Sequence, residues 1–295
     1  MTDEHAERFT RLRPLLFTIA YEITGTATEA DDVLQDGYLR WAEVDLAEVT
    51  DTKAYLARLI TRQALNALRA QSRRREEYVG PWLPEPLLID AADAAHDVVL
   101  AESVSMAMMV VLETLGPDER AVFVLREVFG FDHAEIADAI GKSPAAVRQI
   151  AHRAREHVHA RRRRYEPVDP EASLRLTTQF FATAATGDID GLMTMLAPDV
   201  VWTADSDGKA SAARRPVVGA DRVARVVAGL VRLGGPDGRA EPAMYNGLPA
   251  LVLYLGDTLE GVVVLEIVDG RIANFYAMRN PEKLAGVTVA RTIAR

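Results

Sequence analysis

The chain has 295 residues, with 34 Lys or Arg against 43 Asp or Glu and a formal net charge of −9. It has no cysteine, which excludes disulfides and thiolate metal sites and fits a reducing compartment, so we expect a cytoplasmic protein without a metal or cofactor. No segment approaches the roughly 20 consecutive apolar residues of a membrane span, and the N-terminus lacks the apolar core of a signal peptide, so no membrane association is expected.

Residues 1–78 are predicted to form a helical domain. Gly25 ends the first predicted helix, and Thr28, with Asp31 three residues later, resembles a capping box for the second. The second helix has an apolar stripe formed by Leu34, Tyr38 and Trp41. Its polar surface is formed by Asp31, Asp32, Gln35 and Asp36. An acidic helix surface usually serves solubility alone, and a partner-docking role is the alternative.

A third helix, which starts at Thr52 or Lys53, carries a basic stripe. Its residues recur every three or four positions and therefore share one face: Arg58, Arg62, Asn66, Arg69 and Arg73. Such a stripe can bind phosphates and one or two unstacked bases. Alternatively, it is a solvated arginine face whose stems cover apolar neighbours. The helix offers these arginines no acidic partner, which favours nucleic acid.

Residues 79–100 are predicted to form a linker. Pro81, Pro84 and Pro86 break helices and favour extended backbone. Trp82 and Leu83, however, are too apolar for a purely solvated tether. The linker is therefore either a docking peptide or a segment packed on a neighbouring helix.

Residues 101–165 are predicted to form a second helical domain that ends in a helix-turn-helix. Gly116-Pro117 separates two helices, Gly141 ends the next, and Ser143 caps the last, in which Pro144 takes the first turn. That last helix buries Val147, Ile150, Ala151, Ala154 and Val158. Its exposed face can reach base edges through Arg148, Gln149, His152 and Arg153. The Arg161–Arg164 run can neutralise phosphates; an ordinary helical hairpin is the alternative.

Residues 171–295 are predicted to form an α+β domain after a second boundary at Glu166–Pro170. Helices are expected near 174–184, 189–196 and 220–233, and strands near 200–202, 243–245, 250–255, 261–268 and 272–278. Asn246-Gly247 and Asp269-Gly270 are typical of hairpin turns. Three helices on a curved antiparallel sheet are the predicted architecture.

The acidic helix, the Arg/Asn helix and the helix-turn-helix together resemble regions two and four of bacterial sigma factors of the extracytoplasmic-function (ECF) group, over residues 1–164. This resemblance implies two all-α sigma domains in an initiation subunit of RNA polymerase without enzymatic activity. Docking on the coiled coil of the largest core-polymerase subunit is implied for Asp31, Asp32, Leu34, Gln35, Asp36 and Trp41. Contact with the −10 promoter element is implied for Lys53, Arg58, Arg62, Asn66, Arg69 and Arg73. Contact with the −35 element is implied for Ser143, Arg148, Gln149, His152 and Arg153.

The C-terminal domain resembles the SnoaL-like polyketide cyclase fold, a cone-shaped α+β domain, in Phe180-Phe181, Gly187-Asp188 and Val201-Trp202. One sigma-factor subgroup carries such a fused domain in place of a separate anti-sigma protein. Its marks are Trp82–Pro86, the Asp205–Lys209 loop, which here has Ser206 and Asp207 where glycine is common, and Asn280–Leu284. The resemblance implies interdomain regulation through Trp82, Leu83, Pro84, Asp205, Asp207, Lys209, Asn280, Pro281 and Lys283.

In this interpretation, Trp82 and Leu83 pack near Asp205–Lys209, and polymerase or a ligand biases the arrangement of the sigma domains. We expect the free chain to be a monomer, and a small ligand in the cone stays open. Two other functions compete. The cone could be an enzyme. Its catalytic residues would then be Asp205, Asp207 or Tyr245, since all six histidines precede residue 160 and lie outside this domain. The chain could also be a repressor that binds duplex DNA without polymerase.

Overall fold

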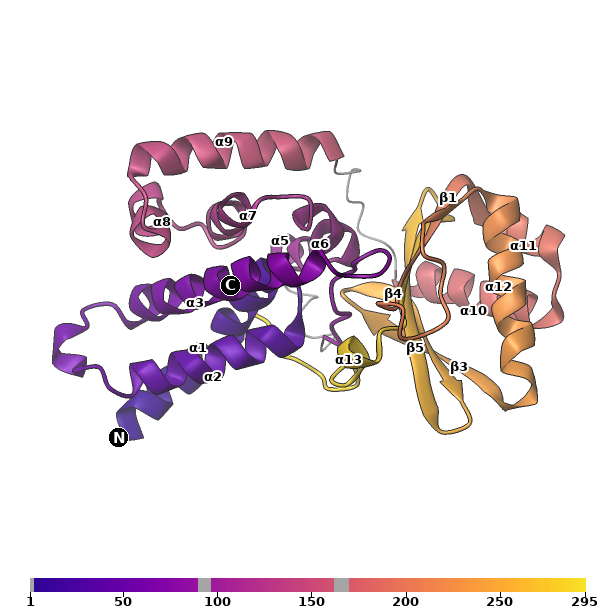
Figure 1. Ribbon diagram of the computed structural model, residues 1–295, viewed down its shortest axis with the longest axis horizontal. Coiled ribbons are helices and arrows are strands. Elements are labelled where there is room, and N and C mark those ends of the chain that lie inside the picture. The colour runs from indigo at the N-terminus through magenta and orange to yellow at the C-terminus, as the bar shows by residue number, and fades with distance from the viewer. Residues whose placement is uncertain (1–2, 90–96, 162–169) are drawn as a thin grey trace. The chain divides into compact units, whose positions relative to one another are not determined.

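A computed structural model of the chain describes residues 3–89, 97–161 and 170–295. These residues form two compact units (Figure 1). The helical unit contains the described residues up to 77, those of 89–163, and residues 290–295. The α+β unit contains residues 78–88 and the described residues up to 289. Among the helices described, none is both long and apolar enough to cross a membrane.

The helical unit gathers both predicted helical domains. Its long helices are α1 (Asp3–Thr24), α2 (Ala27–Trp41), α3 (Thr52–Arg75) and α9 (Pro144–Arg161). Its short elements are η1 (Leu46–Glu48), α5 (Val98–Ser103), α6 (Met106–Leu112), α7 (Pro117–Phe123), η2 (Val124–Val128) and α8 (His133–Ile140). Helix α3 is central, because it packs against α1 and α2 on one side and against α7 and α8 on the other.

The start of α2 differs from the predicted capping box. Gly25 adopts a left-handed conformation with φ of 79°, which ends α1. Thr26 follows in extended conformation, and its hydroxyl accepts a hydrogen bond from Glu29 N at 3.3 Å. Because the chain leaves α1 and enters α2 within two residues, the cap falls on Thr26, and the predicted box at Thr28 and Asp31 is wrong.

The helix-turn-helix is confirmed. Asp132 caps α8, Gly141 ends it with φ of 71°, and Ser143 Oγ accepts from Ala146 N at 3.2 Å to start α9. The predicted apolar stripe of α9 is buried along its whole length: Val147, Ile150, Ala151, Ala154 and Val158. The region before Gly116 has one more break than predicted, because Ser105 caps a new helix through Met108 N.

The α+β unit packs helices on one face of a six-stranded sheet. The helices on this face are α10 (Pro170–Thr186), α11 (Ile189–Met195) and α12 (Ala220–Gly234), and the unit also contains the short elements η3 (Gly235–Asp237) and α13 (Pro281–Leu284). The strands are β1 (Leu196–Asp205), β2 (Val217–Val218), β3 (Gly238–Tyr245), β4 (Leu248–Leu255), β5 (Thr258–Val268) and β6 (Arg271–Met278). The strand order is β2-β1-β6-β5-β4-β3, and in the core the rings of Phe180 and Trp202 both pack against Phe275 in tilted arrangements.

Local turn chemistry explains the meander from β3 to β6. Asn246-Gly247 and Asp269-Gly270 both have positive φ at each residue, which matches the twist of paired strands, so both predicted hairpin turns are confirmed. The predicted α+β fold is confirmed as well, but the sheet is mixed. Strand β1 runs parallel to β6, because a long connection lets these two strands meet in the same direction.

Candidate nucleic-acid interface and linker site

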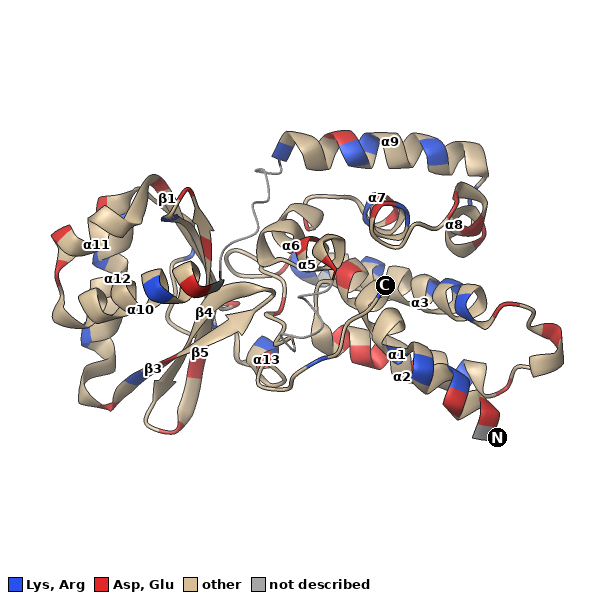
Figure 2. Ribbon diagram, turned by 180° about the vertical axis from the view of Figure 1, so that it is seen from behind, with Lys and Arg blue, Asp and Glu red and all other residues tan. Residues whose placement is uncertain are grey.

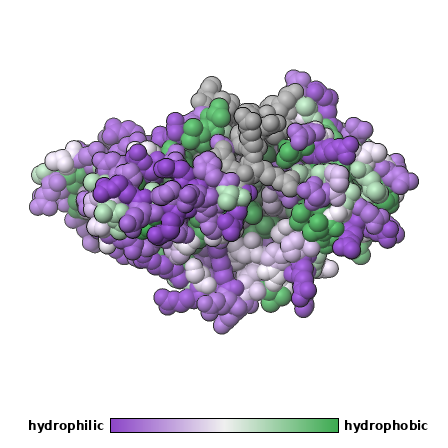
Figure 3. All heavy atoms as spheres, turned by 90° about the horizontal axis from the view of Figure 1, so that it is seen from above, coloured by the Kyte–Doolittle hydropathy of each residue, from purple (hydrophilic) through white to green (hydrophobic). Residues whose placement is uncertain are grey.

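The exposed face of α9 carries the residues that were predicted to read base edges. Arg148, Gln149, His152 and Arg153 are all exposed, and Figure 2 shows basic residues, coloured blue, along this helix. Arg153 Nε lies 3.6 Å from a Glu119 carboxylate oxygen, an exposed pair of little energetic weight. The surface over this side of the helical unit is predominantly hydrophilic (Figure 3). Residues 162–164 of the predicted arginine run lie outside the described residues.

Ser143 has a different part in this interface. Its hydroxyl caps α9 by accepting from Ala146 N, so it fixes where the recognition helix begins. Capping leaves the exposed face of the helix to the Arg, Gln and His side chains.

We call the described residues up to 77 the first half of the helical unit and residues 97–161 its second half. The basic stripe of α3, in the first half, contacts the second half. Arg62 donates from Nη2 to Asp138 O at 2.6 Å and from Nε to Ala139 O at 3.2 Å. These carbonyls belong to the last turn of α8, which is the negative end of its helix dipole. Lys53, Asn66 and Arg73 are exposed, whereas Arg58 is half-buried over the Tyr55 ring. A nucleic-acid strand on this stripe would have to displace the α8 carbonyls.

Asp118, near the start of α7, joins basic groups from both halves of the unit. Its carboxylate lies 2.8 Å from Arg69 Nη2 and 3.0 Å from Lys142 Nζ. Partial burial alone would raise the pKa of Asp118, but hydrogen bonds from these two cations outweigh it, and the pKa is lowered. Asp118 therefore stays ionised and takes the position beside Arg69 that a phosphate could otherwise occupy.

The acidic surface of α2 is present, but two residues for which the resemblance implies docking do not lie on it. Asp32, Gln35 and Asp36 are exposed. Leu34 and Trp41 are buried, so their assignment to direct docking is corrected: Trp41 donates from Nε1 to His5 O at 2.9 Å and anchors the helix. Leu39, a residue not predicted, is 60% exposed beside the acidic surface. Its position one turn from Gln35 and Asp36 could have revealed it.

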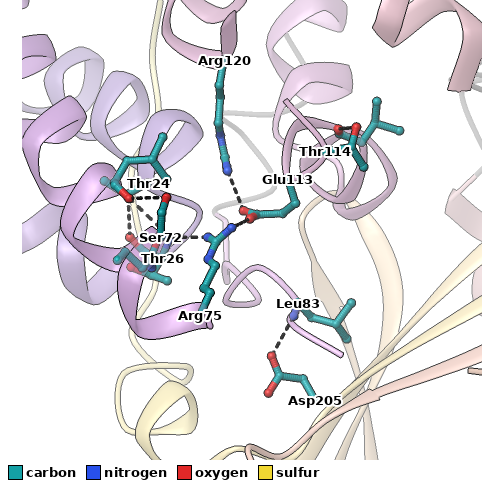
Figure 4. A network of polar contacts seen from close by, with 12 residues as sticks. Thr24, Thr26, Ser72, Arg75, Leu83, Glu113, Thr114, Arg120 and Asp205 are labelled. Atoms are coloured by element: carbon teal, nitrogen blue, oxygen red, sulfur yellow. Dashed lines mark hydrogen bonds and ion pairs between the residues drawn. The ribbon is translucent and has the colours of Figure 1, made fainter. Parts of the chain in front are cut away.

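The linker residues Tyr78–Leu88 lie on the α+β unit, and Asp205 is the centre of their contacts. This fully buried carboxylate accepts from the Tyr78 hydroxyl through Oδ1. Through Oδ2 it accepts from Leu83 N at 2.7 Å (Figure 4) and from Lys283 Nζ at 2.7 Å. Three donors from two distant segments therefore converge on one buried ionisable group and satisfy both of its oxygens.

Lys283 closes this site from the other side. Its side chain is only 5% exposed, and Nζ donates to Leu83 O at 2.6 Å while it sits 3.3 Å from the centre of the Trp82 ring. A cation over an indole ring is attracted by the ring quadrupole. The lysine thus recognises the linker by its backbone and its tryptophan while it neutralises Asp205.

The other marked residues surround this pair. Asn280 caps α13 through Glu282 N and donates to the Tyr78 hydroxyl at 2.8 Å. Pro281 takes the first turn of α13, where its missing N–H is harmless. The loop residue Asp207 accepts from Val79 N and pairs with Lys209 at 2.9 Å. Pro84 is buried. The structure therefore places all nine residues assigned to regulation in or beside the linker site.

Two linker contacts were not predicted. Burial and the Asp205 carboxylate raise the pKa of the Tyr78 hydroxyl, which keeps it a donor. Asn246 pairs twice with Leu87, because Leu87 N donates to its Oδ1 at 2.7 Å and its own N donates to Leu87 O at 2.8 Å. Asn246 had been assigned only to a hairpin turn, and its second use depends on what packs beside the turn.

A buried polar network joins the two halves of the helical unit. Arg120, 1% exposed, donates to Glu22 O at 2.7 Å and pairs with Glu113 at 2.6 Å (Figure 4). Glu113 also pairs with Arg75 of α3. The Glu22 carboxyl is buried and accepts from Ser103 Oγ at 2.6 Å. Burial raises the pKa of Glu22 to about 8.

Comparison with known proteins identifies the families of both helical regions and a relative that spans most of the chain. The chain matches the family models of Sigma-70 region 2 over residues 8–74 and of Sigma-70, region 4 over residues 105–158. It is 38% identical over 290 residues to the ECF RNA polymerase sigma factor SigJ of Mycobacterium tuberculosis, which covers 94% of this chain and 92% of SigJ.

A second relative and a solved structure extend over both units. The probable ECF RNA polymerase sigma factor SigI of the same species is 30% identical over 92% of each chain. The crystal structure of M. tuberculosis SigJ is similar with a TM-score of 0.75 and 34% identity, and it covers 96% of this chain and 99% of that chain. The likeness therefore includes the α+β unit as well as the helices.

Proposed function

We propose, because this chain belongs to the family of ECF RNA polymerase sigma factors, that each exposed polar face described above has a separate part in promoter-specific initiation. The acidic surface of α2 docks on the coiled coil of the largest core-polymerase subunit. The stripe of α3 contacts the −10 element, and α9 contacts the −35 element. The observation that carries this assignment is the exposed Arg148, Gln149 and His152 on a capped recognition helix.

Charge reversal of the α2 surface tests the docking step. The Asp32→Lys/Asp36→Lys protein should bind core polymerase at least about tenfold more weakly, equivalent to roughly 1.4 kcal/mol. Both carboxylates are exposed, so the fold should survive, which circular dichroism can check. Fluorescence anisotropy of labelled chain with core enzyme measures the affinity. Asp190→Lys/Asp257→Lys makes the same charge change at exposed positions of the α+β unit, and equal weakening by both pairs would contradict the assignment.

Removal of one α9 side chain tests promoter reading. With core polymerase present, Arg148→Ala should weaken binding to duplex promoters with an intact −35 element by about 1–3 kcal/mol, and should matter far less when that element is scrambled. Holoenzyme gel shifts measure both. Arg222→Ala, an exposed arginine of α12, removes the same charge elsewhere. An equal loss on intact and scrambled promoters would assign Arg148 to phosphate contact only.

The linker site regulates these activities. The Tyr78–Leu88 segment connects the two sigma regions along the chain, and the α+β unit binds it through Asp205, Asn246 and Lys283. Free linker lets the sigma regions take the separation that promoter elements require, whereas bound linker restricts it. Polymerase can shift this equilibrium only by its different affinity for the two states. Reconstituted transcription with the full chain and a chain stopped near Glu171 measures whether the unit inhibits or activates.

In this proposal, the residues that were considered as catalytic groups have binding or structural roles. Asp205 is fully buried, and both of its carboxylate oxygens already accept hydrogen bonds from the protein itself. Burial raises the pKa of Tyr245 to about 12, far from the range of an acid–base group at neutral pH. We therefore propose a binding and regulatory unit. A gel shift without core enzyme distinguishes a polymerase-independent repressor. A repressor should shift the promoter DNA by itself, whereas a sigma factor should not.

A further inference from the structure

Residues 290–295 return to the helical unit although the preceding residues belong to the α+β unit. Arg291 forms a parallel bridge with Ile89, and Ile293 is buried. A short peptide with a buried apolar anchor and charged residues on both sides is a typical groove ligand. We call residues 290–295 the terminal strap.

The strap contacts the first half of the unit through α1 and α2. Arg291 Nη2 pairs with Asp31 Oδ2 at 2.7 Å, and its guanidinium lies 5.7 Å from the centre of the Phe17 ring. Ala294 N donates to Thr18 Oγ1 at 3.1 Å. The contact with Asp31 is the important one, because this carboxylate is the first residue of the acidic α2 surface.

The strap contacts the second half through its last residue. Arg295 Nη1 donates to Val128 O at 3.2 Å, and Arg295 Nε pairs with Asp97, the residue that caps α5. Both arginines therefore neutralise a carboxylate, one on each half. The strap crosses from α2 to α5 and η2. The two halves therefore cannot separate unless the contacts of the strap with one of them are broken.

We propose that the strap is an intramolecular ligand of the helical unit that competes with core polymerase for the Asp31 end of α2. The inference rests on the proposed docking function of α2. In the strapped state, Asp31 is neutralised by Arg291 and by Arg13, and the two halves are held together. Polymerase must displace the strap, so part of its intrinsic affinity is used to shift this equilibrium.

The test compares core-polymerase affinity of the full chain, a chain stopped after Val289, and Arg291→Ala/Arg295→Ala. Both variants should bind about tenfold more tightly than the full chain, and a synthetic peptide of the sequence ARTIAR should reverse the gain of the stopped chain at millimolar concentration. Arg222→Ala/Arg225→Ala, which removes two exposed arginines of α12, is the charge-matched control and should change nothing.

A second readout does not need polymerase. Amide hydrogen exchange in α2 and in residues 97–103 should be faster in the stopped chain, and ARTIAR peptide should slow it again. Unchanged exchange together with unchanged affinity would overturn the strap proposal while the docking proposal stands. If neither the full chain nor any variant binds core polymerase, the docking proposal fails instead. The exchange result alone then decides whether the strap is a ligand of the helical unit.

Discussion

Replacement of Lys283 by methionine should free the linker from the α+β unit. Methionine keeps most of the buried stem but removes the charge, so Asp205 loses an ion-pair partner inside the protein. Removal of one partner of a buried ion pair typically costs about 3–5 kcal/mol, because the remaining charge is left uncompensated. The contacts of Lys283 Nζ with Leu83 O and the Trp82 ring are lost as well. Thermal unfolding and amide exchange of Leu83, which donates to Asp205, measure the effect.

The neighbouring Lys209 provides a matched control. It pairs with Asp207 and Glu282 in the same region, but its side chain is 39% exposed. Lys209→Met should cost only about 0–1 kcal/mol, because solvent screens exposed pairs. The Asp205→Asn change in the Lys283→Met background should recover part of the loss, since it removes the stranded charge. Similar losses for the two lysine variants would show that Lys283 is not the residue that holds the linker.

The effect on transcription follows from the same equilibrium. If bound linker restricts the sigma regions, Lys283→Met should alter reconstituted transcription in the direction taken by the chain stopped near Glu171. Lys209→Met should alter it much less, because Lys209 touches the linker only indirectly, through its exposed pair with Asp207. A Lys283→Met protein that loses linker protection but transcribes as before would separate the contact from regulation.

Local chemistry explains which parts of the fold were predictable. The turn at Gly141 and the cap at Ser143 depend on neighbours within a few residues, and so do the hairpins at Asn246 and Asp269. The regular burial of α9 follows from helical periodicity alone. The cap of α2 was misplaced because Thr26 and Thr28 are chemically equivalent, and only the path of the chain past Gly25 chooses between them.

Tertiary contacts explain what the sequence did not reveal. Tyr78 and Asp205 are 127 residues apart, and Ser103 and Glu22 are 81 apart. No periodicity relates such positions. Asp205 was nominated through a family resemblance and equally as a catalytic acid, and only its three donors distinguish a linker site from an enzyme. Leu34 and Trp41 show the reverse case, because residues assigned to a surface by resemblance are core residues that hold that surface in place.

The stripe of α3 also has a state that its sequence could not show. In this structure Arg62 is bound to α8 carbonyls and Arg69 to Asp118. The groups that would contact the −10 element are thus partly satisfied within the helical unit. If α3 contacts the −10 element as proposed, promoter opening would require these arginines to exchange internal acceptors for phosphates and bases, which would tie DNA binding to the separation of the two halves.

The buried network that holds those halves should make their union depend on pH. Burial raises the pKa of Glu22 to about 8, from an ordinary value of 4.5. Between these values the packed state keeps a proton that the exposed state has released, so the stabilisation is complete below pH 4.5 and declines as the pH rises towards 8. The slope for one proton is about 1.4 kcal/mol per pH unit, so the change from pH 5 to pH 8 reaches several kcal/mol.

Replacement of Glu22 by glutamine should remove this slope. Glutamine retains an oxygen that can accept from Ser103 Oγ and has no proton to lose. Amide exchange in α1 should therefore accelerate between pH 5 and pH 8 in the native chain beyond the intrinsic exchange rate, but not in Glu22→Gln, and at pH 8 the variant should be the more protected. Glu7→Gln, at an exposed position of the same helix, should follow the native chain. If all three proteins respond alike to pH, Glu22 does not carry the proton on which the packing of the two halves depends.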